Sequence, residues 1–210
     1  MSFYKYPRTL HLPWSEHITT DDKMLPSTDV FVGREVVVTE KLDGENTSMY
    51  RDHYHARSLD SRHHPSRNIC KAIHGAIQYR IPDGWRICGE NVYAKHSIFY
   101  NNLTAFFYVF GVYNDVNECV SWDDTIEMCK LLDLKIVPEL YRGIWDSEEI
   151  KACFGGKSTF GDEKEGYVVR IVDAFPYESF RDNVAKVVRP DHIQSDKMWT
   201  VDWIPNLLRN

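Results

Sequence analysis

Charged side chains stand at the ends of several apolar runs in this sequence, where they could carry out chemistry. A charge beside an apolar strand is costly unless it is paired or functional. The residues in these positions are Lys41, Arg57, Glu90, Glu165 and Lys186. A deprotonated lysine is a nucleophile, and a glutamate is a hard oxygen ligand suited to Mg²⁺. A shared site therefore requires a fold that brings these strand ends together.

The segments between these residues predict more strands than helices. Apolar and β-branched runs predict strands over 36–41, 47–51, 55–59, 85–89, 106–113, 136–141, 166–172 and 184–188. Helices are expected over 69–77, capped by Ser66 or Asn68, after Ser121, and from near Ser147. Asp43-Gly44 predicts a hairpin between the first two strands. Without a regular βαβ rhythm, this pattern favours an α+β fold of antiparallel sheets with flanking helices.

Composition narrows the class of protein. A chain of 210 residues fits one domain, expected over 1–210, and 43% hydrophobic residues exclude a disordered chain. No run approaches the roughly 18 apolar residues of a membrane span, and the N-terminus has no signal-peptide pattern. We therefore expect an intracellular, cytoplasmic protein with no membrane partner. The five cysteines are odd in number and form no C-x-x-C pair, so neither a disulfide framework nor a zinc site is expected.

Positive charge is concentrated in segment 51–80, although the formal net charge is −6. This segment is rich in arginine and histidine, and its only acidic residues are Asp52 and Asp60. Such a surface attracts phosphates, so we expect nucleic-acid contacts from Arg62, His63, His64 and Arg67. The adjacent histidines lack a nearby third ligand, which favours a phosphate-facing or solvated loop over a metal site.

The charged strand ends also follow a known order of motifs, which resembles the covalent nucleotidyltransferase superfamily of polynucleotide ligases and capping enzymes. Lys41-Leu42-Asp43-Gly44 is similar to its K-x-D-G motif, followed by Arg57-Ser58, Gly89-Glu90, the aromatic run 108–110, the run 165–170, and Lys186. The resemblance covers roughly residues 30 to 190. Spacings and the run 89–97 most resemble the phage-type ATP-dependent RNA ligases that repair nicks. The fold implied is a nucleotidyltransferase (ATP-grasp-like) domain.

The resemblance implies a role for each residue. Lys41 would form a covalent lysyl-AMP, its pKa lowered by burial and nearby cations. Lys186 and Arg57 would neutralise the phosphate, and Glu165 would bind Mg²⁺ or Mn²⁺. Glu90 would hold the ribose, Phe110 would stack on adenine, and Arg170 would contact ribose or phosphate. The ATP-binding set is completed by the backbone of Glu40 and by Asn46.

The implied activity is ATP-dependent joining of 5′-phosphate and 3′-hydroxyl RNA ends, as in a nicked duplex. The sequence leaves the oligomeric state open, and we expect a monomer. AMP passes from lysine to the 5′-phosphate and leaves when the 3′-hydroxyl attacks. The alternatives are a DNA ligase, a guanylyltransferase that uses GTP, and an inactive nucleic-acid binding module.

Three features depart from this pattern or are not explained by it. The last motif usually carries a second lysine, but Val188 stands there, with Arg189 next to it. Residues 11–15 either close over the nucleotide or pack against the first strand, and we favour packing. The tail 198–210, which includes Trp199 and Trp203, is too short for the accessory domain that most ligases append.

Overall fold

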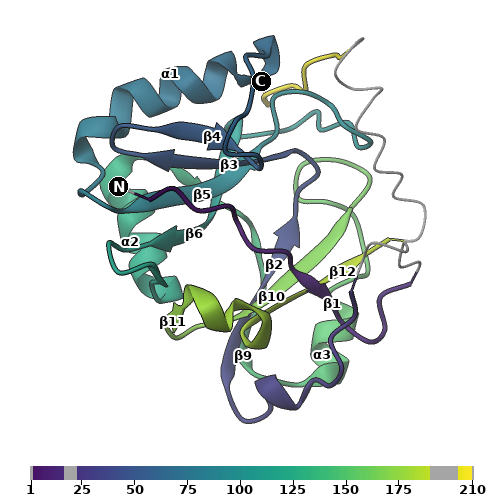
Figure 1. Ribbon diagram of the computed structural model, residues 1–210. Helices are drawn as coiled ribbons and strands as arrows, with labels where there is room; N and C mark the ends of the chain where they lie inside the picture. Colours follow the sequence, from purple (N-terminus) through teal and green to yellow (C-terminus); the bar gives the residue numbers. More distant parts are fainter. Residues whose placement is uncertain (1, 17–22, 190–202, 210) are drawn as a thin grey trace.

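The computed structural model describes residues 2–16, 23–189 and 203–209, and its strands form two sheets (Figure 1). Most neighbouring strands are antiparallel, so the predicted α+β class is confirmed. In Figure 1 the second sheet lies with α1 above it, and the first sheet lies below, beside α3. No helix in the described ranges is both long and apolar enough to cross a membrane. Residues 198–202 and 210 of the tail lie outside the described residues.

The first sheet has five strands in the order β1-β12-β10-β2-β9. Val36, Val37 and Val38 are completely buried although they alternate between faces, because both faces of the sheet are covered. The short strand β1 runs parallel to β12, and the amide of Leu12 donates to the Lys186 carbonyl at 2.8 Å. The start of the segment 11–15 therefore packs on β12 and not on the first predicted strand. The strands are β1 (Leu10–His11), β2 (Glu35–Lys41), β9 (Glu139–Ile144), β10 (Gly166–Ile171) and β12 (Val184–Val188).

The second sheet runs in the order β11-β7-β6-β5-β3-β4, and β8 pairs in parallel with β6. Met49 and Ile87 on its outer face pack with Cys70 of α1 and Cys129 of α2 in one hydrophobic cluster. The strands are β3 (Glu45–Tyr50), β4 (Tyr54–Ala56), β5 (Arg86–Asn91), β6 (Phe107–Tyr113), β7 (Glu118–Cys119), β8 (Lys135–Ile136) and β11 (Phe175–Pro176).

The three predicted helices are present as α1 (Asn68–Ile77), α2 (Trp122–Leu132) and α3 (Ser147–Ala152). Ser121 caps α2 as expected, since its hydroxyl accepts a hydrogen bond from the Asp124 amide at 3.1 Å. The predicted cap of α1 is wrong. Arg67 occupies the N-cap position, and its side chain makes no capping hydrogen bond to the helix, because a 3₁₀ turn (Pro65–Arg67) leads straight into it. Further 3₁₀ turns are Asp29–Phe31, Gln78–Arg80 and Tyr177–Asp182.

The predicted hairpin at Asp43-Gly44 is wrong, because the chain crosses there from one sheet to the other. β2 pairs with β9 and β10, whereas β3 pairs with β4 and β5. Gly44 passes so close to β5 that a Cβ at this position would overlap the carbonyl oxygen of Asn91. The Asp-Gly pair is therefore used for a close backbone approach, and the crossing places Lys41 between the sheets.

A second crossing divides the strand predicted over 136–141. Pro138 separates β8 in the second sheet from β9 in the first, because proline lacks the amide that a continuous ladder needs. The carbonyl of Pro138 accepts a hydrogen bond from the Glu40 amide at 2.8 Å. The strand predicted over 55–59 is also shorter than expected, since β4 ends at Ala56.

Replacing Gly166 with alanine should destabilise the protein, because a Cβ there would overlap the Val187 carbonyl oxygen between β10 and β12. We expect a loss of roughly 1–3 kcal/mol or more in the free energy of unfolding measured with urea. Gly75→Ala is the matched control: no atom lies within 4 Å of its Cβ, and helix propensity should stabilise α1 by up to about 1 kcal/mol. Equal effects of both substitutions would contradict this packing argument.

Candidate active site

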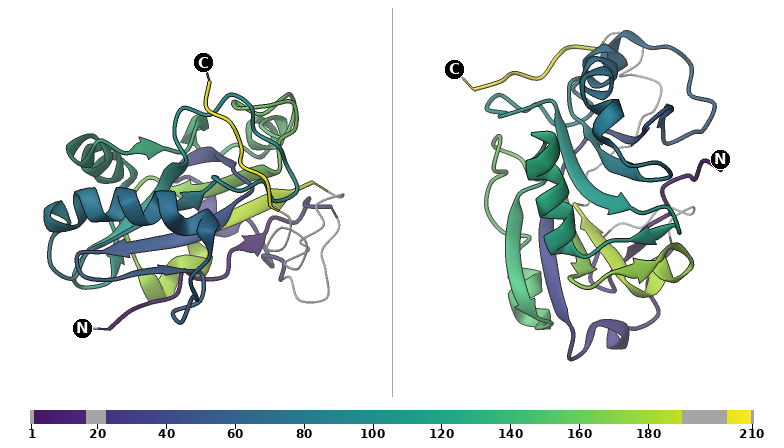
Figure 2. Two further views of the ribbon diagram at one scale, coloured as in Figure 1. Left: turned by 90° about the horizontal axis from the view of Figure 1, so that it is seen from above. Right: turned by 90° about the vertical axis from the view of Figure 1, so that its left-hand side faces the viewer.

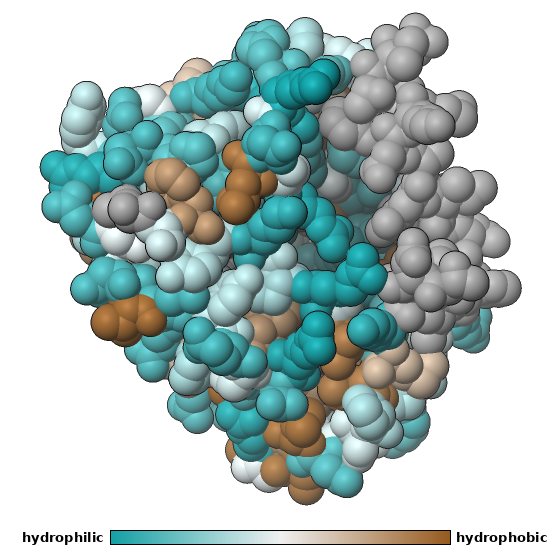
Figure 3. Space-filling view, in the orientation of Figure 1, coloured by the Kyte–Doolittle hydropathy of each residue, from teal (hydrophilic) through white to brown (hydrophobic). Residues whose placement is uncertain are grey.

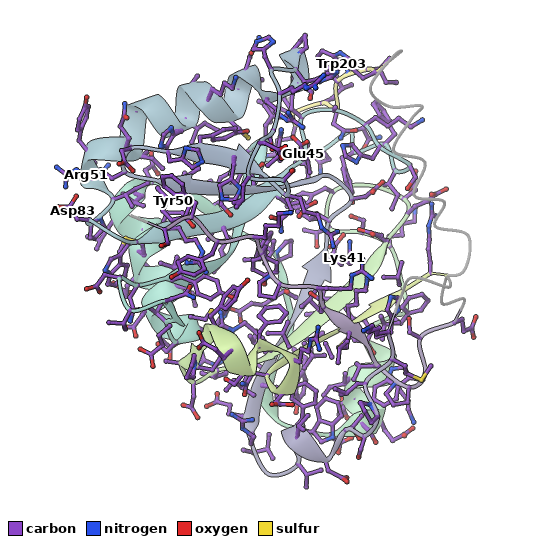
Figure 4. All side chains as sticks on the ribbon, in the orientation of Figure 1. Lys41, Glu45, Tyr50, Arg51, Asp83 and Trp203 are labelled. Carbon is purple, nitrogen blue, oxygen red and sulfur yellow. The ribbon has the colours of Figure 1, made fainter. Side chains whose placement is uncertain are left out.

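Lys41 ends β2 at the crossing between the sheets, where Figure 4 labels it. Its neighbour across the ladder is Gly166, the first residue of β10. Nζ of Lys41 donates a hydrogen bond to Oε1 of Glu165 at 2.6 Å. The carboxylate is almost completely buried, and the lysine side chain keeps 23% of its surface exposed. An amine and a carboxylate are therefore held together at one end of the two neighbouring strands β2 and β10.

The prediction that the pKa of Lys41 is lowered is wrong for the protein without ligands. Burial lowers its pKa, but the negative charges of Glu165, Glu90 and Asp43 together outweigh burial and raise it above the usual value. For Glu165 burial is the larger effect, and it raises the pKa to about 7 despite the attraction of Lys41. Carboxylates rather than cations dominate the surroundings of the amine.

Asp43 fixes the turn that follows Lys41. One carboxylate oxygen, Oδ2, accepts hydrogen bonds at 2.7 Å from the amide and hydroxyl of Ser97 and from the amide of Ile98. The amide of Asp43 donates to the hydroxyl of Tyr100 at 2.9 Å. Sequence analysis missed this network, since only the K-x-D-G motif drew attention to the aspartate. Its role in the structure is to anchor the turn after Lys41 to the loop after β5.

Glu90 and Asn46 face each other across the β5–β3 ladder. Burial, together with the charges of Glu165 and Asp43, raises the pKa of Glu90 to about 8, although Lys41 acts in the opposite direction. Oδ1 of Asn46 is buried and accepts no hydrogen bond from the described residues. A buried acceptor without a donor is uncommon in folded proteins, so it is suited to a donor from a ligand. Glu90, the predicted ribose acceptor, lies near enough to Lys41 for the two charges to interact.

Phe110 occupies a β-bulge in β6. Gly89 pairs with Val109 and Cys88 pairs with Gly111, so Phe110 has no partner on β5. A bulge turns a side chain away from the regular alternation, and the ring is only partly buried between two hydrophobic clusters. Tyr6 contacts it edge-to-face, with ring centroids 4.8 Å apart. This position is compatible with the stacking role that the motif resemblance implied.

Lys186 lies on β12, opposite Val168 of β10 and His11 of β1. Its positive charge acts on Glu165, which places it at the same site. Val188 lies two residues further along the strand and therefore on the same face as Lys186. The guanidinium of Arg189 donates to Glu163 at 2.6 Å instead. Arg189 therefore does not take the place of the expected second lysine.

Two predicted nucleotide contacts are used by the protein itself. The guanidinium of Arg170 is buried and donates to the carbonyls of Ile171 and Val120 at 3.0 and 2.9 Å. Arg170 is thus held by internal hydrogen bonds in this structure, and its contact with ATP stays a prediction. The carboxylate of Glu40 is also buried, where it accepts hydrogen bonds from Ser158 and from the amide of Thr159. Its side chain anchors a loop, and its amide is bonded to Pro138.

Arg57 lies exposed on the bend after β4, one residue beyond the pair Thr47–Ala56. It is therefore at the same end of the second sheet as Asn46. No contact among the described residues joins it to Lys41. Its predicted role in neutralising phosphate stays a prediction.

The candidate nucleic-acid residues divide into two groups. Arg62 and His63 are exposed, as a phosphate-binding surface requires. Arg67 instead forms a two-bond ion pair with Glu45, with Nε to Oε2 at 2.7 Å, and also donates to the carbonyl of Arg62. The ring of His64 caps the 3₁₀ turn by accepting from the amide of Ser66. The nucleic-acid contacts of all four residues stay a prediction, and the internal bonds of Arg67 and His64 favour Arg62 and His63 for this role.

A divalent cation fits this site only with help from a substrate. Within the described ranges, no group of three or more His, Cys, Asp or Glu side chains is arranged to hold a metal ion. The buried carboxylate of Glu165 is a single hard oxygen ligand. Mg²⁺ commonly binds one or two carboxylates together with substrate phosphates, and Glu165 suits that mode.

Several solved structures that share this fold are those of an RNA ligase. Structures of substituted forms of the Naegleria gruberi RNA ligase match this chain with TM-scores of 0.57 for an apo form and 0.58 for a form with ATP and manganese. Their identities are 19% and 18%; the matches cover 82% and 78% of this chain but 54% and 52% of those chains. This chain thus spans about half of their length. No curated protein matches the sequence.

A comparison with family models gives a broader match. The model described as RNA ligase matches residues 34–188, which include every strand from β2 to β12. This range also contains Lys41, Glu90, Glu165 and Lys186. Because the matched range is well over half of the chain, the protein belongs to the RNA ligase family.

Proposed function

We propose that this protein is an ATP-dependent RNA ligase that joins 5′-phosphate and 3′-hydroxyl ends through a covalent lysyl-AMP. The observation that carries the proposal is the position of Lys41 between the sheets, with its amine 2.6 Å from Glu165. Glu90 and Lys186 act electrostatically on these two residues, so four charged motif residues share one site. A catalytically inactive binding module would have no need for this costly cluster.

The proposed first step is attack by Nζ of Lys41 on the α-phosphorus of ATP. Before the attack, the Lys41 ammonium gives one proton to water, which reaches its partly exposed side chain. A P–N bond then forms while the bond from the α-phosphorus to the oxygen of the β-phosphate breaks, and pyrophosphate leaves with the second proton of the nitrogen. The raised pKa of Lys41 keeps the amine protonated before ATP binds. Lys186 would stabilise the negative charge that builds up on the phosphate. A divalent cation on Glu165 would neutralise the carboxylate and the phosphates.

The next two steps use the same residues. The 5′-phosphate of RNA attacks the lysyl-AMP phosphorus, so the P–N bond breaks and a pyrophosphate bond forms. The 3′-hydroxyl then attacks the activated 5′-phosphate and AMP leaves. The neighbouring RNA ligase was solved with ATP and manganese, which supports ATP and a divalent metal as the reactants here.

Covalent labelling tests the proposal directly. The protein is incubated with Mg²⁺ or Mn²⁺ and with ATP, GTP or NAD that carries label in the nucleotide, and is then denatured and separated by gel electrophoresis. We expect label from ATP, reduced at least about a hundredfold in Lys41→Ala because the nucleophile is lost. Lys151→Ala, on exposed α3, is the matched lysine control. Label from GTP alone would favour a guanylyltransferase, and no label from any nucleotide would refute the enzyme proposal.

Glu90 should lower stability in exchange for ATP binding. Because folding raises its pKa from about 4.5 to about 8, the folded protein binds the proton more tightly than the unfolded chain. The free energy of unfolding should therefore fall as pH rises through this window. Glu90→Gln should flatten that slope and stabilise the ligand-free protein at alkaline pH by roughly 1–3 kcal/mol, measured with urea.

The same substitution should raise the ATP concentration for half-maximal labelling by about tenfold, because a charged acceptor for the ribose is lost. Glu127→Gln, an exposed carboxylate on α2, should change neither quantity. A Glu90→Gln protein that is less stable at alkaline pH would contradict the electrostatic account of the site.

RNA binding should depend on the exposed members of the basic segment. Figure 3 shows a largely hydrophilic face with hydrophobic residues in small separate groups. Replacing both Arg62 and His63 with alanine should weaken nicked-RNA binding severalfold and make its salt dependence shallower, by about one in log–log slope for each lost phosphate contact. Gel shifts at several salt concentrations measure this.

Arg67→Ala is the contrasting variant. It should lower stability, because Glu45 would keep a partly buried charge without its ion pair. The salt dependence of RNA binding should stay unchanged in the folded protein. If Arg67→Ala made the salt dependence of RNA binding shallower than the double substitution of Arg62 and His63 does, our division of the basic residues would be wrong.

A further inference from the structure

The turn of residues 42–44 that follows Lys41, here called the nucleophile turn, is connected to a segment far from it in sequence. Asp43 bonds to Ser97 and Ile98 through its carboxylate and to Tyr100 through its amide. All three partners lie in the loop between β5 and β6. The position of the turn after Lys41 therefore depends on the conformation of that loop.

Asn206 holds this loop from the other side. Its Oδ1 accepts a hydrogen bond from the Tyr100 amide at 2.8 Å, and its Nδ2 donates to the Val92 carbonyl at 2.8 Å. Only 1% of its surface is exposed. Val92 directly follows β5, the strand that carries Glu90, so one side chain links the end of that strand to the residue that holds Asp43.

The backbone around Asn206 strengthens the link. Segment 203–209 runs beside the loop, shown in yellow next to the teal chain in Figure 2. Amides and carbonyls join the two segments at 2.8–3.0 Å through Lys95–Ile204, Asn206–Tyr93, Leu207–Tyr100, Leu103–Leu207 and Arg209–Leu103. A strand added to a sheet edge is held by such backbone bonds alone. Here the buried side chain of Asn206 also fixes which residues of the two segments pair.

We infer that Asn206 is a positioning residue for enzyme adenylylation: by fixing Tyr100 relative to the end of β5, it sets the position of Lys41 relative to Glu90. This inference rests on the proposed function. Glu90 and Lys41 come from different sheets, so their separation is not fixed by one hydrogen-bond ladder. A displacement of about 1 Å between reacting groups can cost about a hundredfold in rate.

The test compares Asn206→Ala with Asn183→Ala in the full-length chain. Asn183 is the matched control, since it is also buried and its Nδ2 donates to the Ser179 carbonyl at 2.7 Å, away from the nucleophile turn. Two quantities are measured at a temperature where both variants are folded. One is the rate of labelling by ATP as a function of ATP concentration. The other is the hydrogen exchange of the Asp43, Ser97 and Ile98 amides.

We expect Asn206→Ala to lower the labelling rate at saturating ATP by about 10- to 100-fold, because the amine is misplaced. The ATP concentration for half-maximal rate should change by less than about threefold. The Asp43, Ser97 and Ile98 amides should exchange faster. Asn183→Ala should leave both the rate and this exchange unchanged, even where it lowers stability as much. Equal slowing in both variants, or unchanged exchange in a folded Asn206→Ala, would overturn the inference.

Two further variants keep the test decisive if Asn206→Ala does not fold. Tyr100→Phe removes only the hydroxyl that accepts from Asp43, and Asn206→Asp keeps an acceptor for Tyr100 but loses the donor to Val92. Both should slow labelling at saturating ATP, and normal rates in both would refute the inference. If the unsubstituted protein takes no label from any nucleotide, the proposed function fails, and hydrogen exchange alone decides whether Asn206 holds the turn.

Discussion

The site depends on one contact, the hydrogen-bonded ion pair between Lys41 and Glu165. It joins the end of β2 to the residue before β10, and the glycine that follows Glu165 lets β10 lie close to the Val187 carbonyl of β12. A buried ion pair is weak evidence for stability, since desolvation offsets much of the attraction. The pair lies where the chain crosses from one sheet to the other, and this position is better explained by the proposed function than by stability.

Carboxylates outnumber cations around Lys41 in the protein without ligands. Glu165, Glu90 and Asp43 surround an amine whose pKa they raise, and the two glutamates have raised pKa values themselves. Such a cluster costs folding free energy, because several acidic groups are removed from water together. A nucleotide and a divalent cation would supply the positive charge and the hydrogen-bond donors that it lacks.

The motif residues also divide by task more clearly than their resemblance to a family indicated. Lys41, Glu90 and Lys186 interact electrostatically at the proposed active site. Arg170 and Glu40 instead form internal hydrogen bonds that hold strands and loops in place. Arg189 pairs with Glu163, so Val188 leaves the face of Lys186 without a second cation at that position. Residues of one motif set therefore include both the proposed reacting groups and residues that hold the structure around them.

The sequence by itself determined most local elements and indicated the charged residues Lys41, Glu90, Glu165 and Lys186, which the structure brings to one site. β-branched runs, the Ser121 cap and the charged strand ends were readable because they depend on neighbours in the chain. The sheet crossing at Asp43-Gly44 was missed, since an Asp-Gly turn looks the same whether or not its strands pair. The raised pKa of Lys41, the internal bonds of Arg170 and the clamp of Asn206 on Tyr100 were also not predictable. They depend on residues distant in sequence, and only the tertiary structure decides which charges and donors meet.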